Sequence, residues 1–205
     1  MNFGCLVLAA GKGRRFGSEK QFFSWKGTQL WSRSYNTLRE ATSGDIVVVG
    51  LDIEGGRTRQ ESVRSGLRLI DSEKVIIFEA ARPLASEQDV INLVEEDHPS
   101  VTFGSKIDTP VYNFKTKKYI QPSGIRVIQN LQCFETNLLK KAHEETKLKN
   151  AGDDTIVMHE ALNIEPRILD ADMFNLWKVI EKKDLFVLEA LAYSQDKEIS
   201  SELIF

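Results

Sequence analysis

The sequence is poor in cysteine and histidine. Its two cysteines, Cys5 and Cys133, lie far apart in the chain, which provides neither a disulfide framework nor the paired spacing of a zinc site. The three histidines, His98, His143 and His159, share no metal-ligand spacing. We therefore expect a reducing compartment and no zinc centre, and we interpret each histidine as a helix-surface or loop residue.

An excess of charge of one sign is also absent. The chain has 27 Lys and Arg against 30 Asp and Glu, a net charge of −3, which argues against broad binding to nucleic acids or anionic membranes. No apolar run approaches the roughly 20 residues that span a bilayer, and the first residues lack the pattern of a secretory signal. We expect a cytoplasmic protein with no membrane or nucleic-acid partner, whose anionic ligands meet local clusters of cations.

The chain does contain short apolar runs separated by amphipathic segments. Three of these runs, Cys5–Ala9, Ile46–Val49 and Val75–Phe78, are apolar throughout rather than at alternate residues. Such runs are typical of parallel strands that helices cover on both faces. With 205 residues, 41% of them hydrophobic, the chain has the size of a single domain spanning 1–205.

Helix start signals lie between and after these runs. Thr58–Glu61 and Ser86–Asp89 have the pattern of capping boxes, and two later helices are expected from Phe134 and from Asp184. This alternation predicts a Rossmann-like, doubly wound α/β fold with a mostly parallel sheet. Residues 109–126 break the alternation with prolines, a glycine and short β-type pieces, and we expect them to form a protruding β-arm.

The loop after the first strand combines glycine with positive charge. In open α/β sheets, ligands bind outside the carboxyl ends of the strands, and this loop begins at such an end. Glycines let the backbone approach a bulky anion, and cations beside them would lie along a phosphate chain. The loop has three glycines and four cations: Gly11, Lys12, Gly13, Arg14, Arg15, Gly17 and Lys20.

Two better-known glycine-rich motifs do not fit this loop. A dinucleotide fingerprint needs its third glycine one position before Gly17 and an acidic residue about 20 positions further on, and Asp52 is too distant. A Walker loop needs four residues between its first glycine and Gly-Lys-Ser/Thr, which is absent. A mobile surface turn is the structural alternative, and the doubled arginine followed by Lys20-Gln21 argues against it.

The run Ala9–Gly17 followed by Lys20-Gln21 resembles a known signature. It is similar to that of the nucleotidyltransferases that make CDP-alcohols, and most similar to 2-C-methyl-D-erythritol 4-phosphate cytidylyltransferases. Further blocks that resemble this family follow in the same order, and the resemblance is strongest before residue 90. These blocks are Gly55–Leu67, Glu79–Pro83, Gln129–Phe134 with Asp153-Asp154, and Lys178-Val179 with Asp184-Leu185.

The resemblance implies a nucleotide-diphospho-sugar transferase type of fold and a CTP-dependent, magnesium-dependent cytidylyltransferase. It places Arg15 and Lys20 on the triphosphate and Lys178 among the catalytic residues, where otherwise each would be a solvated cation. Ser62 is equally consistent with bonding the backbone of its own helix. The nucleotide-binding positions that the resemblance implies are Ala9, Ala10, Gly11, Gly13, Gly55, Gly56, Ser62 and Ala80.

The resemblance also implies a magnesium site. Glu79 stands where the family has a metal-binding aspartate, and Mg²⁺ often takes one or two carboxylates together with phosphate oxygens. As an alternative, Glu79 merely ends a strand. A second ligand position of the family is close to Asn175, whose neutral amide is a poor ligand, and Asp172 is the nearby carboxylate.

The acceptor is less well defined than the nucleotide. Where the family binds its polyol phosphate on the arm, this chain has Phe114 and Pro122, and cations lie only at adjacent positions. 2-C-methyl-D-erythritol 4-phosphate is the preferred acceptor, and another polyol phosphate such as ribitol 5-phosphate is the alternative. A catalytically inactive nucleotide-binding protein is a second alternative. The arm implies a homodimer, by resemblance alone.

Overall fold

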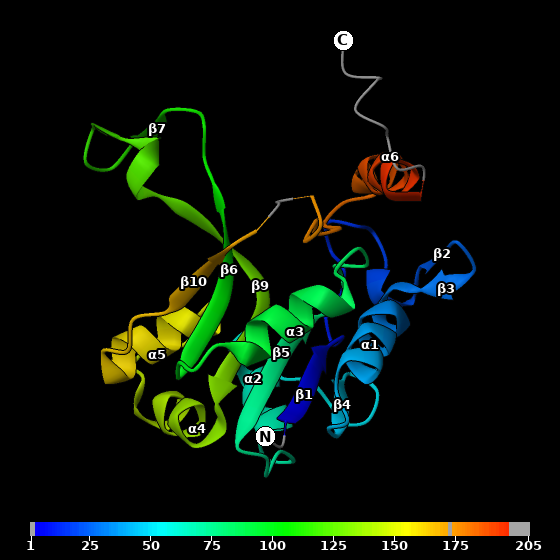
Figure 1. Cartoon of the computed structure of the whole chain (residues 1–205), viewed down its shortest axis with the longest axis horizontal. Helices are drawn as coiled ribbons and strands as arrows, with labels where there is room; N and C mark the ends of the chain where they lie inside the picture. The colour runs from blue at the N-terminus through cyan, green and yellow to red at the C-terminus, as the bar shows by residue number, and fades with distance from the viewer. Residues whose placement is uncertain (1–2, 172–173, 197–205) are drawn as a thin grey trace.

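The computed structural model describes residues 3–171 and 174–196. Its centre is a six-stranded sheet in the order β10-β6-β9-β5-β1-β4 (Figure 1). β1 pairs in parallel with β4 and β5, and β10 with β6, whereas β9 runs antiparallel between β5 and β6. The bounds are β1 Phe3–Leu8, β4 Ile46–Val49, β5 Lys74–Glu79, β6 Ser100–Lys106, β9 Arg126–Glu135 and β10 Arg167–Asp170.

Helices cover both faces of this sheet. α1 (Leu30–Ala41) and α3 (Glu87–Glu95) pack on the face to which β1 turns Cys5 and Val7. The opposite face, to which β1 turns Leu6, is covered by α2 (Arg59–Leu67), α4 (Thr136–Glu145) and α5 (Asp154–Leu162). Every residue of β5 is buried, as strands covered on both sides require. The expected doubly wound α/β fold is confirmed.

The helix start signals are confirmed with two differences. Ser86 and Asp89 form a complete capping box at α3. At α2, Thr58 accepts from the Glu61 N–H, but the Glu61 carboxylate accepts from Arg57 N rather than from Thr58. The helix expected from Phe134 begins at Thr136, because Phe134 still belongs to β9 and pairs there with β5 and β6.

Residues 109–126 form the expected β-arm, which projects from the body (Figure 1). Its strands β7 (Val111–Asn113) and β8 (Lys118–Ile120) pair antiparallel, and the short 3₁₀-helix η2 (Pro122–Gly124) follows them. The Tyr112 ring lies 5.3 Å from that of Phe114 and 5.0 Å from that of Tyr119. Phe114 is 87% exposed, so the arm presents aromatic surface to its surroundings.

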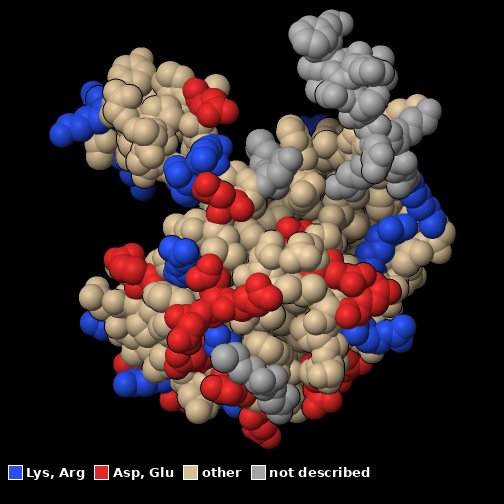
Figure 2. Space-filling model, viewed as in Figure 1, with Lys and Arg blue, Asp and Glu red and all other residues tan. Residues whose placement is uncertain are grey.

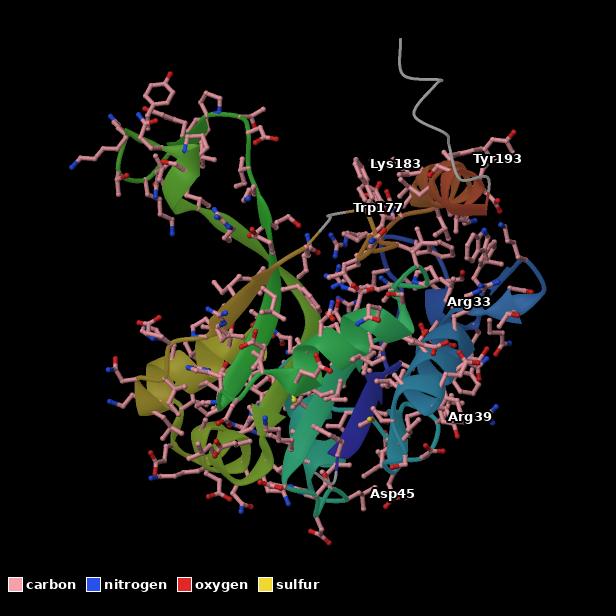
Figure 3. All side chains as sticks on the ribbon, viewed as in Figure 1. Arg33, Arg39, Asp45, Trp177, Lys183 and Tyr193 are labelled. Atoms are coloured by element: carbon pink, nitrogen blue, oxygen red, sulfur yellow. The ribbon has the colours of Figure 1, made fainter. Side chains whose placement is uncertain are left out.

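A third apolar cluster joins the two ends of the described chain. α6 (Asp184–Asp196) packs Leu188 onto Phe16 and Trp25, close to the hairpin of β2 (Ser24–Trp25) and β3 (Thr28–Gln29). The Trp25 indole N–H donates to Glu189 at 2.6 Å, and the Arg33 guanidinium lies 4.3 Å from the Trp25 ring. Figure 3 shows Arg33 on α1, Lys183 just before the start of α6 and Tyr193 on α6. This packing fixes the C-terminal segment beside the first loop.

Within the described residues, no helix has both the length and the apolar character that crossing a membrane requires.

Candidate active site

A cavity of about 920 Å³ opens at the carboxyl ends of β1 and β5. Open α/β sheets bind their ligands at this edge, outside the carboxyl ends of the strands. Five segments of the chain line it, and they bring together all twelve residues that the sequence predicts for the site. These residues are Ala9, Ala10, Gly11, Gly13, Arg15, Lys20, Gly55, Gly56, Ser62, Glu79, Ala80 and Lys178.

Gly13 allows the first loop to fold back on itself. Its φ is +54°, in the left-handed region, and a Cβ at this position would lie 1.7 Å from the Ser18 carbonyl oxygen. The Gly13 carbonyl in turn accepts from Gly17 N at 2.8 Å. Glycine has no Cβ and adopts a positive φ without steric strain. Gly13 therefore allows the tight turn that brings Arg15 and Lys20 to the cavity.

Gly55 and Gly56 form the wall opposite the first loop. A Cβ on Gly55 would lie 2.2 Å from the Ala10 Cβ, so no side chain fits between the two segments. The Ser62 hydroxyl accepts from Gly56 N at 3.0 Å and donates to the Thr58 carbonyl at 3.1 Å. Ser62 thus bonds the backbone of its own helix, as one interpretation expected, and through Gly56 it holds the cavity wall in place.

Glu79 ends β5 with its carboxylate among three cations. Lys178 Nζ lies 2.6 Å from the carboxylate, Arg82 Nε 3.4 Å and Arg59 Nε 3.5 Å. Burial alone would raise the pKa of Glu79, but the attraction of Lys178, Arg82 and Arg59 outweighs it and holds the pKa below its ordinary value. The carboxylate is therefore ionised at neutral pH.

Arg59 connects Glu79 to a second buried carboxylate. Arg59 Nη1 lies 2.7 Å from Asp154, which has no exposed side-chain surface, and His143 Nε2 lies 3.0 Å from the same group. Burial works to raise the pKa of Asp154, and Arg59 and His143 overcome it and lower the pKa. His143 is 3% exposed, so its interpretation as a surface residue is wrong. It lies on the inward face of α4, where only a partner such as Asp154 satisfies a buried imidazole.

Lys20 lies between the first loop and the C-terminal segment. It begins the 3₁₀-helix η1 (Lys20–Phe22), and its Nζ donates to the Val179 carbonyl at 2.6 Å. Burial lowers the pKa of Lys20 to about 8, and repulsion by Lys178 adds to the effect while Glu79 opposes it. The segment that carries Lys178 is itself attached to the end of β5, because Val179 N donates to the Ala81 carbonyl.

The positive charge of this cavity is local. Among the described residues that line it, Glu54 and Glu79 are the only acids, against the cations Lys12, Arg14, Arg15, Lys20, Arg57, Arg59 and Lys178. Figure 2 shows no comparable basic field on the face that it presents, where acidic side chains spread over the middle of the body. An anion with several charges therefore finds its strongest attraction in the cavity.

Metal ligands are sparse at the site. No group of three or more His, Cys, Asp or Glu side chains among the described residues is arranged to hold an ion. Glu79 offers a hard carboxylate ligand at the cavity, which fits Mg²⁺ only when phosphate oxygens and water complete its shell. Asn175 is not among the residues lining the cavity, and Asp172 lies outside the described residues.

The contributions of Arg59, Arg82 and Asp154 were not predicted from the sequence. Arg59 and Arg82 lie inside the motifs around Gly55 and Glu79, and Asp154 lies in the Asp153-Asp154 pair. A buried acid that ends a strand requires cationic neighbours, and arginines within the same motifs are the signal for them. Asp153 caps α5 by accepting from Thr155 N, which directs the neighbouring Asp154 side chain inward.

Comparison with known proteins yields a consistent result. The family model for 2-C-methyl-D-erythritol 4-phosphate cytidylyltransferase matches residues 4–194. The enzyme of that name from Thermotoga neapolitana is 29% identical, over 91% of this chain and 95% of its own length. The one from Geobacillus thermodenitrificans is also 29% identical, over 97% of this chain and 100% of its own.

A solved structure agrees with the fold. The 2-C-methyl-D-erythritol 4-phosphate cytidylyltransferase from Thermus thermophilus superposes with a TM-score of 0.78 at 23% identity, covering 94% of this chain and 100% of that one. At this identity the likeness establishes the arrangement of the helices and strands.

Proposed function

Because the chain belongs to the 2-C-methyl-D-erythritol 4-phosphate cytidylyltransferase family, we propose that it transfers CMP from CTP to 2-C-methyl-D-erythritol 4-phosphate and releases pyrophosphate. This reaction serves the biosynthesis of isoprenoid precursors. The observation that carries the proposal is the convergence of the first loop, the Gly55–Ser62 segment, Glu79 and Lys178 on one cationic cavity.

The reaction requires two anions to meet. A phosphate oxygen of the acceptor attacks the α-phosphorus of CTP, and the bond from that phosphorus to the oxygen bridging to the β-phosphate breaks. Pyrophosphate leaves with the electron pair of that bond, and no protein nucleophile takes part. Arg15, Lys20 and Lys178 line the cavity and neutralise charge that spreads over the phosphates in the transition state.

The base is recognised by backbone groups rather than by charged side chains. Ala10 lies against Gly55, so the wall between these segments is narrow and admits a pyrimidine ring more readily than a purine. The N–H of Gly56 is taken by Ser62. Ser62 therefore acts by fixing the wall, while free backbone groups of the two segments contact the cytosine.

Mg²⁺ is part of the proposal, with Glu79 as its protein ligand. Bound there, the ion would supply Lewis-acid stabilisation of the phosphate oxygens. Glu79 carries one negative charge among Arg59, Arg82 and Lys178, so its surroundings repel a free cation. We therefore propose that Mg²⁺ enters only together with the nucleotide, whose phosphates supply the missing negative charge.

The side chains of the β-arm do not determine which polyol phosphate is the acceptor. Phe114 is 87% exposed and Pro122 begins η2, and neither side chain donates a hydrogen bond to phosphate. This departure from the family pattern keeps ribitol 5-phosphate as a second candidate acceptor. It also supports a homodimer, because an arm with exposed aromatic rings is stable in water when a second copy covers it. The buried free thiols of Cys5 and Cys133 support a cytoplasmic location.

A pyrophosphate-release assay tests the function. Purified protein is incubated with CTP, Mg²⁺ and either 2-C-methyl-D-erythritol 4-phosphate or ribitol 5-phosphate, with UTP and ATP as nucleotide controls. We expect turnover with CTP and the methylerythritol phosphate. Turnover with ribitol 5-phosphate alone would identify the second candidate. CTP binding without any turnover would identify a nucleotide-binding protein and overturn the proposed reaction.

A further inference from the structure

A second cavity lies between α2 and α4, away from the proposed active site. Its volume is about 350 Å³, and it is lined by Arg64, Leu67, Arg68, Lys140, His143 and Glu144. None of these residues lines the larger cavity. The first residues of α2 line the larger cavity, which we call the nucleotide cavity from here on, and the second half of α2 lines the smaller one. One helix therefore contacts both cavities.

The charge of this second cavity is predominantly positive. Among the residues that line it, Arg64, Arg68 and Lys140 outnumber one acid, Glu144, and the exposed carboxylate of Asp71 lies 3.9 Å from Lys140 Nζ. Lys140 Nζ donates to the Ile70 carbonyl at 2.6 Å, which uses one of its three protons. The Arg68 side chain is exposed and has no ion pair or hydrogen bond within the described part of the chain. The guanidinium of Arg68 is therefore available to an anion.

Two polar atoms behind this surface have no partner. Arg64 donates one Nη to the His143 carbonyl at 2.5 Å, while its Nε is buried without an acceptor. The His143 ring is 3% exposed and directs Nε2 to Asp154, and its Nδ1 is likewise buried without a partner. Folded proteins leave few buried polar atoms unpaired. Arg64 and His143 both line this cavity, so the Arg64 guanidinium at its wall keeps hydrogen-bonding capacity that no described protein group uses.

We propose that this cavity binds a small phosphorylated molecule as a second ligand site. Phosphate is the anion that two neighbouring guanidinium groups suit best, because the planar fork of arginine donates two parallel hydrogen bonds to it. Leu67 and the aliphatic stem of Lys140 form the apolar part of the wall, against which the non-phosphate part of the ligand packs. The site does not depend on the function proposed above.

Phenyl phosphate is a suitable probe, because it joins a phosphate to a compact apolar ring. We expect its titration, followed by amide chemical shifts in NMR spectra, to move resonances of 64–70 and 140–144. Arg68→Ala should raise the dissociation constant at these residues about tenfold, since one charge-assisted contact is lost. Arg68 is on the surface, so this variant should fold normally.

Controls separate this site from the nucleotide cavity. Arg39→Ala removes an exposed arginine from α1, on the opposite face of the sheet (Figure 3), and should leave the titration unchanged. Lys20→Ala should alter only shifts around the nucleotide cavity. Shifts confined to residues 9–20 and 55–62, or an equal response in wild type and Arg68→Ala, would overturn the proposal. So would benzoate binding at 64–70 as tightly as phenyl phosphate, because the site would then not be selective for phosphate.

Discussion

The guanidinium of Arg59 lies 2.7 Å from the carboxylate of Asp154, inside the molecule and directly behind the nucleotide cavity. The same guanidinium lies 3.5 Å from Glu79, which lines the cavity. Arg59 thus shares its charge between a carboxylate that holds it in place and one that faces the substrates. The position of the Glu79 carboxylate therefore depends in part on Asp154, whose side chain is fully buried.

Replacing Asp154 by asparagine should destabilise the fold. Arg59 would lose the charge that balances it in the interior, and breaking a buried pair in this way costs about 3–5 kcal/mol. Urea denaturation measures the free energy of unfolding. Asp71→Asn is the matched control, because Asp71 is fully exposed, and its effect should stay within about 0.5 kcal/mol. A loss below about 1 kcal/mol for Asp154→Asn would contradict the proposed role of this pair.

The ion pair of Arg59 and Asp154 should also make the stability of the fold depend on pH. The pKa of Asp154 is lower in the folded protein than in the unfolded chain, where it is about 3.9. Below about pH 4 the unfolded chain therefore takes up a proton that the folded protein refuses, and the free energy of unfolding falls as the pH falls. Urea titrations between pH 3 and 7 should show this fall, with a smaller slope in Asp154→Asn. Equal slopes in wild type and Asp154→Asn would mean that another acidic residue causes the loss of stability at low pH.

Lys20→Ala should lower kcat/KM at least about 100-fold, because in the proposed mechanism Lys20 stabilises charge that develops on the phosphates. Circular dichroism should show an intact fold, since the residue is partly exposed. Lys147→Ala, which removes an exposed lysine from the loop after α4, is the control and should be as active as wild type. An unchanged kcat/KM in Lys20→Ala would remove Lys20 from the mechanism.

The affinity for CTP should fall at alkaline pH. Lys20 has a pKa of about 8, so its charge disappears from the free enzyme as the pH rises above this value. Between pH 8 and 9.5 we expect the dissociation constant of CTP, measured by calorimetry, to rise by about tenfold. Lys20→Arg keeps its charge over this range and should remove most of the rise. If the dissociation constant rose equally in Lys20→Arg, a group other than Lys20 would be responsible for the pH dependence.

Magnesium should bind with the nucleotide and not before it. The three cations around Glu79 repel a free ion, so calorimetry of Mg²⁺ into protein alone should show no saturable binding at 1 mM. With CTP present, Glu79→Gln should weaken Mg²⁺ binding and lower turnover, while Glu79→Asp, which keeps the carboxylate, should lose less. Saturable binding of Mg²⁺ to the protein alone would show that the ion has further ligands.

Ser62→Ala should raise the KM for CTP and leave kcat nearly unchanged. The variant loses the hydrogen bonds to Gly56 N and to the Thr58 carbonyl, and a loosened wall costs about 1 kcal/mol of ground-state binding, or roughly fivefold in KM. Ser65→Ala, on the same helix but not lining the cavity, serves as the control. A fall in kcat with an unaltered KM would show instead that Ser62 acts in the transition state.

From the sequence we predicted β1, β4 and β5, the starts of α2, α3 and α6, and the glycine-rich first loop, but not β6, β9 or β10. These features are local, because an apolar run, a capping serine or a glycine that must fold back is contained within a few neighbouring residues. The cavity-lining positions followed from the family resemblance, and the structure brings all of them to one cavity. The predicted start of α4 was two residues too early, because a buried apolar residue such as Phe134 is compatible with the end of a strand as well as with a helix.

The contacts between charged side chains could be seen only in the folded structure. Arg59, His143 and Asp154 belong to three separate helices or their ends, and nothing in their spacing along the chain indicates that they touch. The same is true of Arg59 and Lys178 beside Glu79, whereas Arg82 follows Glu79 by only three residues. Electrostatic energy depends on the distance between charges and on their burial, and both quantities exist only after the helices have packed against the sheet.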